Sequence, residues 1–146
     1  MINLPIIVER IKELMFDNNK TVNNISSDLN IEASLVYRCL RGEGLLQTFY
    51  LFKIADYFLC SLDFLFGIEN ELYIIRLLLY PPFGDRLVQL YKQKGLTEYQ
   101  VMKETKISRS RLHDWRCNLR LPTPENLVIL SQYFDCSLDY LVGRTN

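Results

Sequence analysis

The stretch YFLCSLDFLFG, residues 57–67, returns as YFDCSLDYLVG at residues 133–143, a shift of 76 residues. The same shift, carried back through the chain without a gap, also matches Arg10 with Arg86 and Ser34 with Ser110. The other matched pairs are Pro5 and Pro81, Leu14 and Leu90, Thr21 and Thr97, Ile31 and Ile107, Leu45 and Leu121, and Leu51 and Leu127. Self-similarity at a fixed period indicates one structural unit used twice. We therefore predict two domains, residues 1–70 and 81–146, joined by residues 71–80.

The second copy carries start and stop signals for five short helices and no convincing strand alternation. The first predicted helix, residues 86–94, ends before Gly95, and Thr97 with Gln100 forms a capping box that starts the second. Caps for the remaining three helices are Ser108, Thr123 followed by Pro124, and Ser137. The predicted inward residues are Leu87, Leu90, Tyr91, Val101, Met102, Leu112, Trp115, Leu127, Leu130 and Tyr133 or Phe134. The predicted fold class is all-α.

Two short helices joined by a tight turn, the second rich in Arg and Ser, have the layout of a helix-turn-helix. The segment ISRSRLHDWRCNLRLPTPENLVILSQYFDCSLDYLVGR, residues 107–144, resembles the lambda repressor-like Cro/XRE family of bacterial and phage DNA-binding domains. The resemblance covers about 60 residues of each copy and is stronger in the second. It implies two tandem five-helix domains of the lambda repressor-like helix-turn-helix type.

The resemblance also implies that the third helix of the second copy enters the major groove of DNA. Its base-facing positions are then Arg109, Ser110, His113 and Asp114, with Arg111 beside them and Ser108 at the helix start. An Arg fork matches the two acceptors on the major-groove edge of guanine. Asp114 either accepts a hydrogen bond from a donor such as the cytosine amine or pairs with Arg111 or Arg116. The loop after the helix supplies phosphate contacts that include Asn118 and Arg120.

The corresponding face of the first copy is poorer in donors. Its groove-facing positions are Ala33, Ser34, Tyr37 and Arg38, with Leu35 in the place of Arg111, and Arg41 is a candidate phosphate contact. Glu32 before this helix and Glu43 after it carry negative charge, which repels DNA. The family usually has Gln at the start of the second helix, where this chain has Val22 and Glu98. Whether the first copy touches DNA or presents a solvated or partner-covered surface stays open.

Charge divides between the copies although the whole chain has a formal net charge of zero. Residues 1–70 carry six Lys and Arg against nine Asp and Glu, a net charge of −3. Residues 81–146 carry ten Lys and Arg against seven Asp and Glu, a net charge of +3. A polyanion such as DNA is therefore attracted to the second copy and mildly repelled by the first.

The join, residues 71–80, is apolar on nearly all sides if it is helical. This pattern predicts a connecting helix that is buried between the copies or against a second chain. It favours a homodimer or a protein partner contacted through the first domain and this helix. A membrane-surface helix needs a strongly cationic polar face, and Arg76 is the only cation in this segment.

Other functional classes find little support in the sequence. The four cysteines contain no C-x-x-C pair and His113 is the only histidine, so we predict no metal or other cofactor and interpret the cysteines as buried free thiols. No G-x-S-x-G motif, Gly-rich phosphate loop or placeable carboxylate pair supports an enzyme. The N-terminus lacks the pattern of a secretory signal and no charge-free stretch has the length of a membrane span, so we expect a cytoplasmic protein.

The leading interpretation is a sequence-specific transcriptional regulator that binds double-stranded DNA through its second domain. The alternative is a protein-interaction module that uses the same scaffold to bind another regulator or a toxin. The neutral net charge and the apolar side chains of the first copy favour this alternative.

Overall fold

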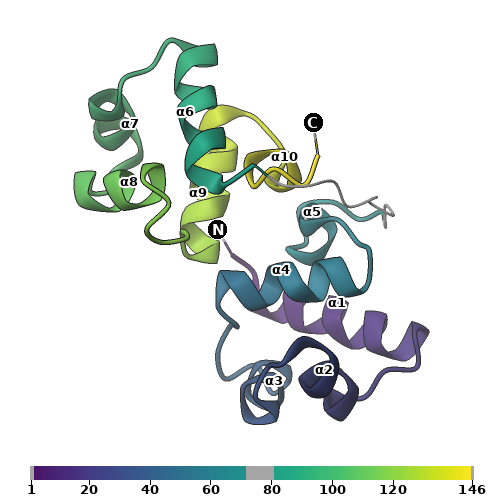
Figure 1. Ribbon diagram of the computed structural model, residues 1–146. Coiled ribbons are helices and arrows are strands. Elements are labelled where there is room, and N and C mark those ends of the chain that lie inside the picture. Colours follow the sequence, from purple (N-terminus) through teal and green to yellow (C-terminus); the bar gives the residue numbers. More distant parts are fainter. Residues whose placement is uncertain (1, 72–80, 146) are drawn as a thin grey trace. The chain divides into compact units, whose positions relative to one another are not determined.

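The computed structural model describes residues 2–71 and 81–145. In these residues the chain forms ten α-helices and no β-strand, which confirms the predicted all-α class (Figure 1). The chain divides into two compact units. We call residues 2–71 the first unit and residues 81–145 the second unit. The predicted connecting helix over residues 71–80 lies, apart from Glu71, outside the described residues.

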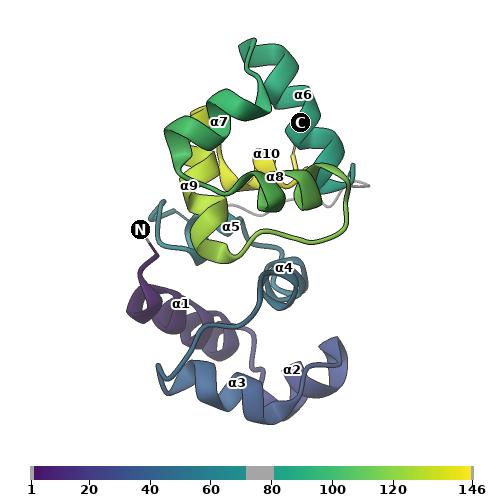
Figure 2. The ribbon, with the colours of Figure 1, turned by 90° about the vertical axis from the view of Figure 1, so that its left-hand side faces the viewer.

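Each unit contains five helices. Those of the first unit are α1 (Leu4–Asp17), α2 (Val22–Leu29), α3 (Ala33–Leu40), α4 (Thr48–Tyr57) and α5 (Leu62–Leu65). Those of the second unit are α6 (Phe83–Lys94), α7 (Glu98–Thr105), α8 (Arg109–Arg116), α9 (Pro124–Phe134) and α10 (Leu138–Leu141). Within the first unit α2 packs on α3 and α4, and α1 packs on α3 and α5 (Figure 2). Within the second unit α8 packs on α6 and α7, and α9 packs on α7 and α10.

The helix starts in the second unit follow the predicted caps. Thr97, Ser108, Thr123 and Ser137 each accept a hydrogen bond from the backbone N–H three residues later, and the Thr97–Gln100 capping box is complete. These bonds satisfy N–H groups that have no partner inside the helix. The start of α6 was predicted wrongly, because α6 begins at Phe83, three residues before Arg86.

A repeated set of left-handed backbone positions shows how closely the two units correspond. Among the described residues, ten have positive φ, and they form five pairs separated by 76 residues. The pairs are Asn19 and Gly95, Asn30 and Lys106, Gly42 and Asn118, Leu59 and Asp135, and Gly67 and Gly143. Left-handed residues end helices and redirect the chain. The turns between helices therefore repeat along with the helices.

The core of each unit is built from the apolar faces of its helices. In the second unit Leu87, Val101, Leu112 and Leu127 are fully buried, and Trp115 is nearly so. Of the two candidates in α9, Phe134 is buried and Tyr133 is half-buried, while Met102, predicted to point inward, is also half-buried. In the first unit the fully buried residues include Ile7, Ile25, Leu51, Ile54 and Leu65.

A cation over an aromatic ring also recurs in both units. The Arg10 guanidinium lies 4.0 Å from the Phe64 ring centroid, and the Arg86 guanidinium lies 4.1 Å from the Tyr140 ring centroid. Each pair joins the first helix of its unit to the last. Since Arg86 is buried, this contact and its 3.3 Å hydrogen bond to the Thr145 carbonyl stabilise a charge away from water. Among the described residues no helix has the length and hydropathy that crossing a membrane requires.

Candidate nucleic-acid interface

The α7–turn–α8 segment positions the side chains that the sequence singled out. The turn between the helices, residues 106–108, starts with Lys106 in the left-handed conformation and ends with Ser108, the N-cap of α8. Ile107 between them is buried and fixes the turn to the core. The start of α8 is thereby held by both a backbone turn and an apolar anchor. In Figure 1 the two helices lie next to each other in the second unit.

One face of α8 is anchored and the opposite face is open. Leu112 and Trp115 are buried, whereas Ser110, His113 and Cys117 are exposed. Residues three and four positions apart share a face of an α-helix, so these three exposed side chains form one line opposite the buried pair. The Ser110 hydroxyl oxygen lies 3.3 Å from that of Ser108. The exposed line presents hydroxyl, imidazole and thiol groups to the surroundings.

Arg109 and Arg111 lie on either side of this line. Two positions apart on an α-helix, their side chains leave the axis roughly 160° apart. Both are exposed, and neither makes an ion pair within the described residues. The two guanidinium groups are therefore available to bind anions on opposite flanks of the helix.

Asp114 pairs differently from the prediction. Its Oδ2 lies 3.8 Å from Arg120 Nε and its Oδ1 lies 3.5 Å from His113 Nδ1, so pairing with Arg111 or Arg116 was wrong. Arg116 is instead 3.3 Å from Glu98 Oε2. Arg120 brings its charge close to Asp114 from the loop after α8, and this positive charge offsets the repulsion between Asp114 and an approaching phosphate.

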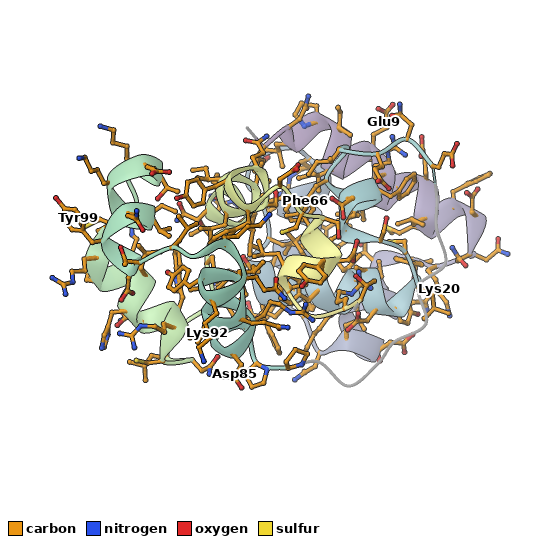
Figure 3. The ribbon with its side chains drawn as sticks, turned by 90° about the horizontal axis from the view of Figure 1, so that it is seen from above. Glu9, Lys20, Phe66, Asp85, Lys92 and Tyr99 are labelled. Carbon is orange, nitrogen blue, oxygen red and sulfur yellow. The ribbon has the colours of Figure 1, made fainter. Side chains whose placement is uncertain are left out.

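Asn118 has a structural role that the sequence did not reveal. Its Oδ1 accepts a 2.7 Å hydrogen bond from the Gly84 N–H, and its Nδ2 donates to Asp85 Oδ1 at 3.3 Å. The Asn118 side chain thus provides a hydrogen-bond partner for a backbone N–H in the first turn of α6. Asp85 in the first turn and Lys92 in the last turn mark this helix in Figure 3. The side chain of Arg120, the second loop residue predicted to contact phosphate, is 80% exposed.

Glu98 occupies the first position of α7, where the resembled family usually has Gln. Its side chain is 20% exposed and faces Arg116 rather than open solvent. Burial, with the Glu98 carboxylate as the next cause, raises the pKa of the nearby Tyr91 phenol. In the first unit the residue at the same place, Val22, is buried. In both units the side chain at this position is therefore taken up by contacts within the protein.

The corresponding residues of the first unit lie on and just after α3. Ser34, Tyr37, Arg38 and Arg41 are all exposed, but Arg41 Nε and Nη2 donate to the Glu43 carboxylate at 2.9 and 3.1 Å. The Arg38 guanidinium lies across Gly44, so that a Cβ there would come within 3.3 Å of Arg38 Nε. Arg41 is thus largely neutralised by its own neighbour, unlike Arg109 and Arg111.

Cys117 is the member of the α8 surface that the sequence analysis did not select. Its Sγ lies 3.7 Å from His113 Nε2. The prediction of four buried thiols is wrong here, since Cys117 is exposed and Cys136 is half-buried; Cys39 and Cys60 are buried, and burial raises the pKa of Cys39. The sequence signal that could have identified Cys117 as a surface residue was the spacing of Ser110, His113 and Cys117 at i, i+3 and i+7. This spacing places the three residues on one helix face.

A comparison with known protein families points to this same region. A family model described as Helix-turn-helix matches residues 87–141. The chain is 33% identical over 64 residues to "Uncharacterized HTH-type transcriptional regulator YobD" of Bacillus subtilis strain 168, covering 44% of this chain and 57% of that protein. It is 30% identical over 61 residues to "HTH-type transcriptional activator BcrR" of Enterococcus faecalis, covering 42% of this chain and 30% of that protein.

The matched regions thus span less than two thirds of either relative. No solved structure matches the chain significantly. The match over residues 87–141 runs from α6 to α10 and includes the whole α7–turn–α8 segment. This segment of the second unit is similar in sequence to helix-turn-helix proteins.

Proposed function

We propose that this protein is a non-enzymatic transcriptional regulator that binds double-stranded DNA with α8 of the second unit in the major groove. One observation carries the proposal: exposed Arg109 and Arg111, without ion-pair partners among the described residues, flank an exposed polar line on a helix anchored by Leu112 and Trp115. The helix-turn-helix match over residues 87–141 and the names of the two relatives support it.

The arrangement assigns different tasks to the side chains of α8. Ser110 and His113 face the floor of the groove, where short donors and acceptors meet base edges. Arg109 is at the first position of α8 and reaches either a guanine edge or a phosphate, and Arg111 reaches the opposite flank. Arg120 adds a phosphate contact from the loop, whereas the side chain of Asn118 supports this surface by holding α6 in place.

The decisive experiment is selection of binding sites from a random duplex pool, followed by affinity measurements with the selected site across a salt series. We compare the wild type with R109A/R111A, in which both substituted side chains are exposed and the core is untouched. A matched control, K92A/K94A, also removes two positive charges, but from the last turn of α6. Each phosphate neutralised contributes about 0.9 to the slope of log K against log salt.

We expect an enriched motif with the wild type and the control, and loss of specific binding in R109A/R111A. Equal affinity in R109A/R111A and the wild type would place the reading surface elsewhere. The absence of any enriched motif even at low salt, where phosphate attraction is strongest, would overturn the proposal as a whole.

A second candidate function, protein interaction, is favoured by one observation on the first unit. Its counterpart of the α8 surface has Leu35 in the place of Arg111, and Arg41 is bound to Glu43. The double variant R38A/R41A tests whether this unit also contacts DNA. We expect unchanged affinity for the selected site, and a loss comparable to that of R109A/R111A would show that both units bind DNA.

A further inference from the structure

Asp114 is the only acidic residue in a stretch of the second unit that is otherwise cationic. Residues 106–120 contain one lysine, four arginines and this single carboxylate. A carboxylate on a surface that meets phosphates lowers the affinity for DNA, because like charges repel each other. A carboxylate in this place therefore either stabilises the fold or selects among DNA sequences.

The fold does not require a carboxylate at this position. The chain has Arg38, of opposite charge and exposed, 76 residues earlier on α3. The two contacts of Asp114 are also long, since its oxygens lie 3.5 Å from His113 Nδ1 and 3.8 Å from Arg120 Nε. Direct hydrogen bonds from nitrogen to oxygen are roughly 2.7–3.2 Å long. Neither contact therefore uses up the capacity of the carboxylate to accept a hydrogen bond.

The Asp114 side chain belongs to the open side of α8. It is 33% exposed and lies four positions after Ser110 and three positions before Cys117, both of which are exposed. Residues at these spacings share one helix face. The carboxylate is thus carried on the surface that the proposed function places against base edges. Arg120 reduces its repulsion with the phosphates, so that it can approach DNA.

A carboxylate in the major groove can accept hydrogen bonds from only two base atoms, cytosine N4 and adenine N6. The adenine amine lies between two acceptors, its own N7 and O4 of the paired thymine, and both repel a carboxylate. The cytosine amine has an acceptor on one side only, O6 of the paired guanine, and the C5–H edge of its own ring on the other. Cytosine is therefore the base that a carboxylate favours.

We propose that Asp114 is a specificity-determining residue that selects a cytosine in the binding site by accepting a hydrogen bond from its N4 amine. The carboxylate weakens binding to every other base at that position, because it then stays desolvated without a donor. Arg120 keeps the Asp114 side chain in place and contacts the backbone phosphates itself. The inference rests on the proposed function and deepens it by naming one base that α8 reads.

The first test repeats the selection from random duplex DNA with D114N. Asparagine keeps the shape of the side chain, removes its charge and pairs with adenine in preference to cytosine. The matched control is D135N, which removes an exposed carboxylate just after α9, where φ is 51° and asparagine is also tolerated. Circular dichroism and thermal unfolding verify that both variants remain folded.

The second test uses the wild-type protein and changes one atom group of the DNA. At the position where D114N loses its preference, N4-methylcytosine replaces cytosine. The methyl group takes the place of the amine hydrogen that points into the groove, whereas pairing with guanine is kept. We expect the affinity of the wild type and of D135N to fall at least about fivefold, and that of D114N to change by much less.

A purely structural role of Asp114 gives a different result. If Asp114 only held Arg120, D114N would resemble R120A, which should bind all duplexes more weakly and lower the slope of log K against log salt by about 0.9. A reading role predicts that D114N binds unrelated duplexes at least as well as the wild type, because a repulsive charge is gone, while its preference for cytosine is lost.

We expect a cytosine in the motifs of the wild type and D135N that is absent from the motif of D114N. The inference is overturned if D114N keeps this cytosine, if N4-methylcytosine leaves wild-type affinity unchanged, or if D114N weakens all duplexes equally. The variant R109A/R111A separates the two proposals. If it loses specific binding while D114N keeps the wild-type motif, only the role of Asp114 fails; if the wild type enriches no motif, the proposed function itself fails.

Discussion

Glu98 at the start of α7 and Arg116 at the end of α8 form an ion pair, with Glu98 Oε2 3.3 Å from Arg116 Nε. The pair joins the two helices of the candidate DNA-binding segment. The repeat places Val22 and Leu40 at these positions in the first unit, so that an apolar pair stands where the second unit has an ionic one.

This relationship predicts a non-additive stability effect. Glu98→Val alone leaves the partly buried Arg116 without its carboxylate and should lower the free energy of unfolding by about 1–2 kcal/mol. Combined with Arg116→Leu, it recreates the apolar pair and should stay within about 1 kcal/mol of the wild type. Urea unfolding of the two single variants and the double variant gives the coupling energy. Additive losses would mean that the two side chains do not stabilise the helix pair jointly.

Gly84→Ala should be strongly destabilising although α6 is otherwise an ordinary helix. A Cβ at this position would lie 2.4 Å from the Arg116 carbonyl oxygen and 2.5 Å from that of Trp115. Relieving such a contact requires backbone shifts, which typically cost about 1–3 kcal/mol. Thermal unfolding measures the loss. Gly95→Ala is the control, since its Cβ meets open space and it carries only the cost of positive φ, about 1 kcal/mol. A smaller loss for Gly84→Ala than for Gly95→Ala would contradict the close approach of α6 and α8.

Asn118 should be replaceable only by a residue that keeps its backbone conformation. Its φ is 58°, and the matched residue of the first unit is Gly42. Asn118→Gly removes the hydrogen bond to the Gly84 N–H but relieves the left-handed backbone, so we expect a loss of about 1 kcal/mol. Asn118→Ala removes the bond and adds strain, so its loss should be larger. Chemical denaturation of both variants is the measurement, and equal losses would show that the backbone is not constrained at this position.

Stability should decrease at high pH because of Tyr133. Burial, aided by the Glu104 carboxylate, raises the pKa of Tyr133 to about 12. The ordinary pKa of tyrosine is about 10, so between these values the unfolded chain loses its proton while the folded chain keeps it. The stabilisation is therefore present below about pH 10 and is lost as the pH rises towards 12. Denaturation between neutral and alkaline pH follows the loss, and Glu104→Gln should reduce it. If Glu104→Gln and the wild type lose stability over the same pH range, Glu104 does not contribute to the raised pKa of Tyr133.

The pKa of Glu43 reports whether Arg41 is neutralised in the first unit. The hydrogen bonds from Arg41 lower the pKa of Glu43, and the charge of Arg38 adds a smaller effect. NMR titration of the side-chain carboxylate should therefore show a higher pKa in Arg41→Ala and a smaller rise in Arg38→Ala. The reverse order would mean that Arg38, and not Arg41, is the partner of Glu43 in solution.

Much of the helical structure follows from the sequence because its signals are local. A cap such as Ser108 or Thr123 acts on a backbone N–H only three residues away, and both positions began helices as predicted. The same holds for the buried faces, since Leu112 and Trp115 share one side of α8 by helical spacing alone. The described residues form ten helices in two compact units. That the 76-residue repeat corresponds to two tandem domains of one type stays a prediction.

The partners of polar side chains were decided only by the tertiary structure. Asp114 approaches Arg120, Arg116 approaches Glu98, and Asn118 binds a backbone group of residue 84, which lies 34 positions away. Which polar side chains pair depends on which ends of the packed helices meet. Several cations along the chain fit the same sequence pattern, so the sequence does not select one of them as the partner. The sequence alone therefore determined where the helices of the second unit begin, with the exception of α6, and which faces they bury. Tertiary packing decided which charges remain free to meet a ligand, because an ion pair depends on distance in space.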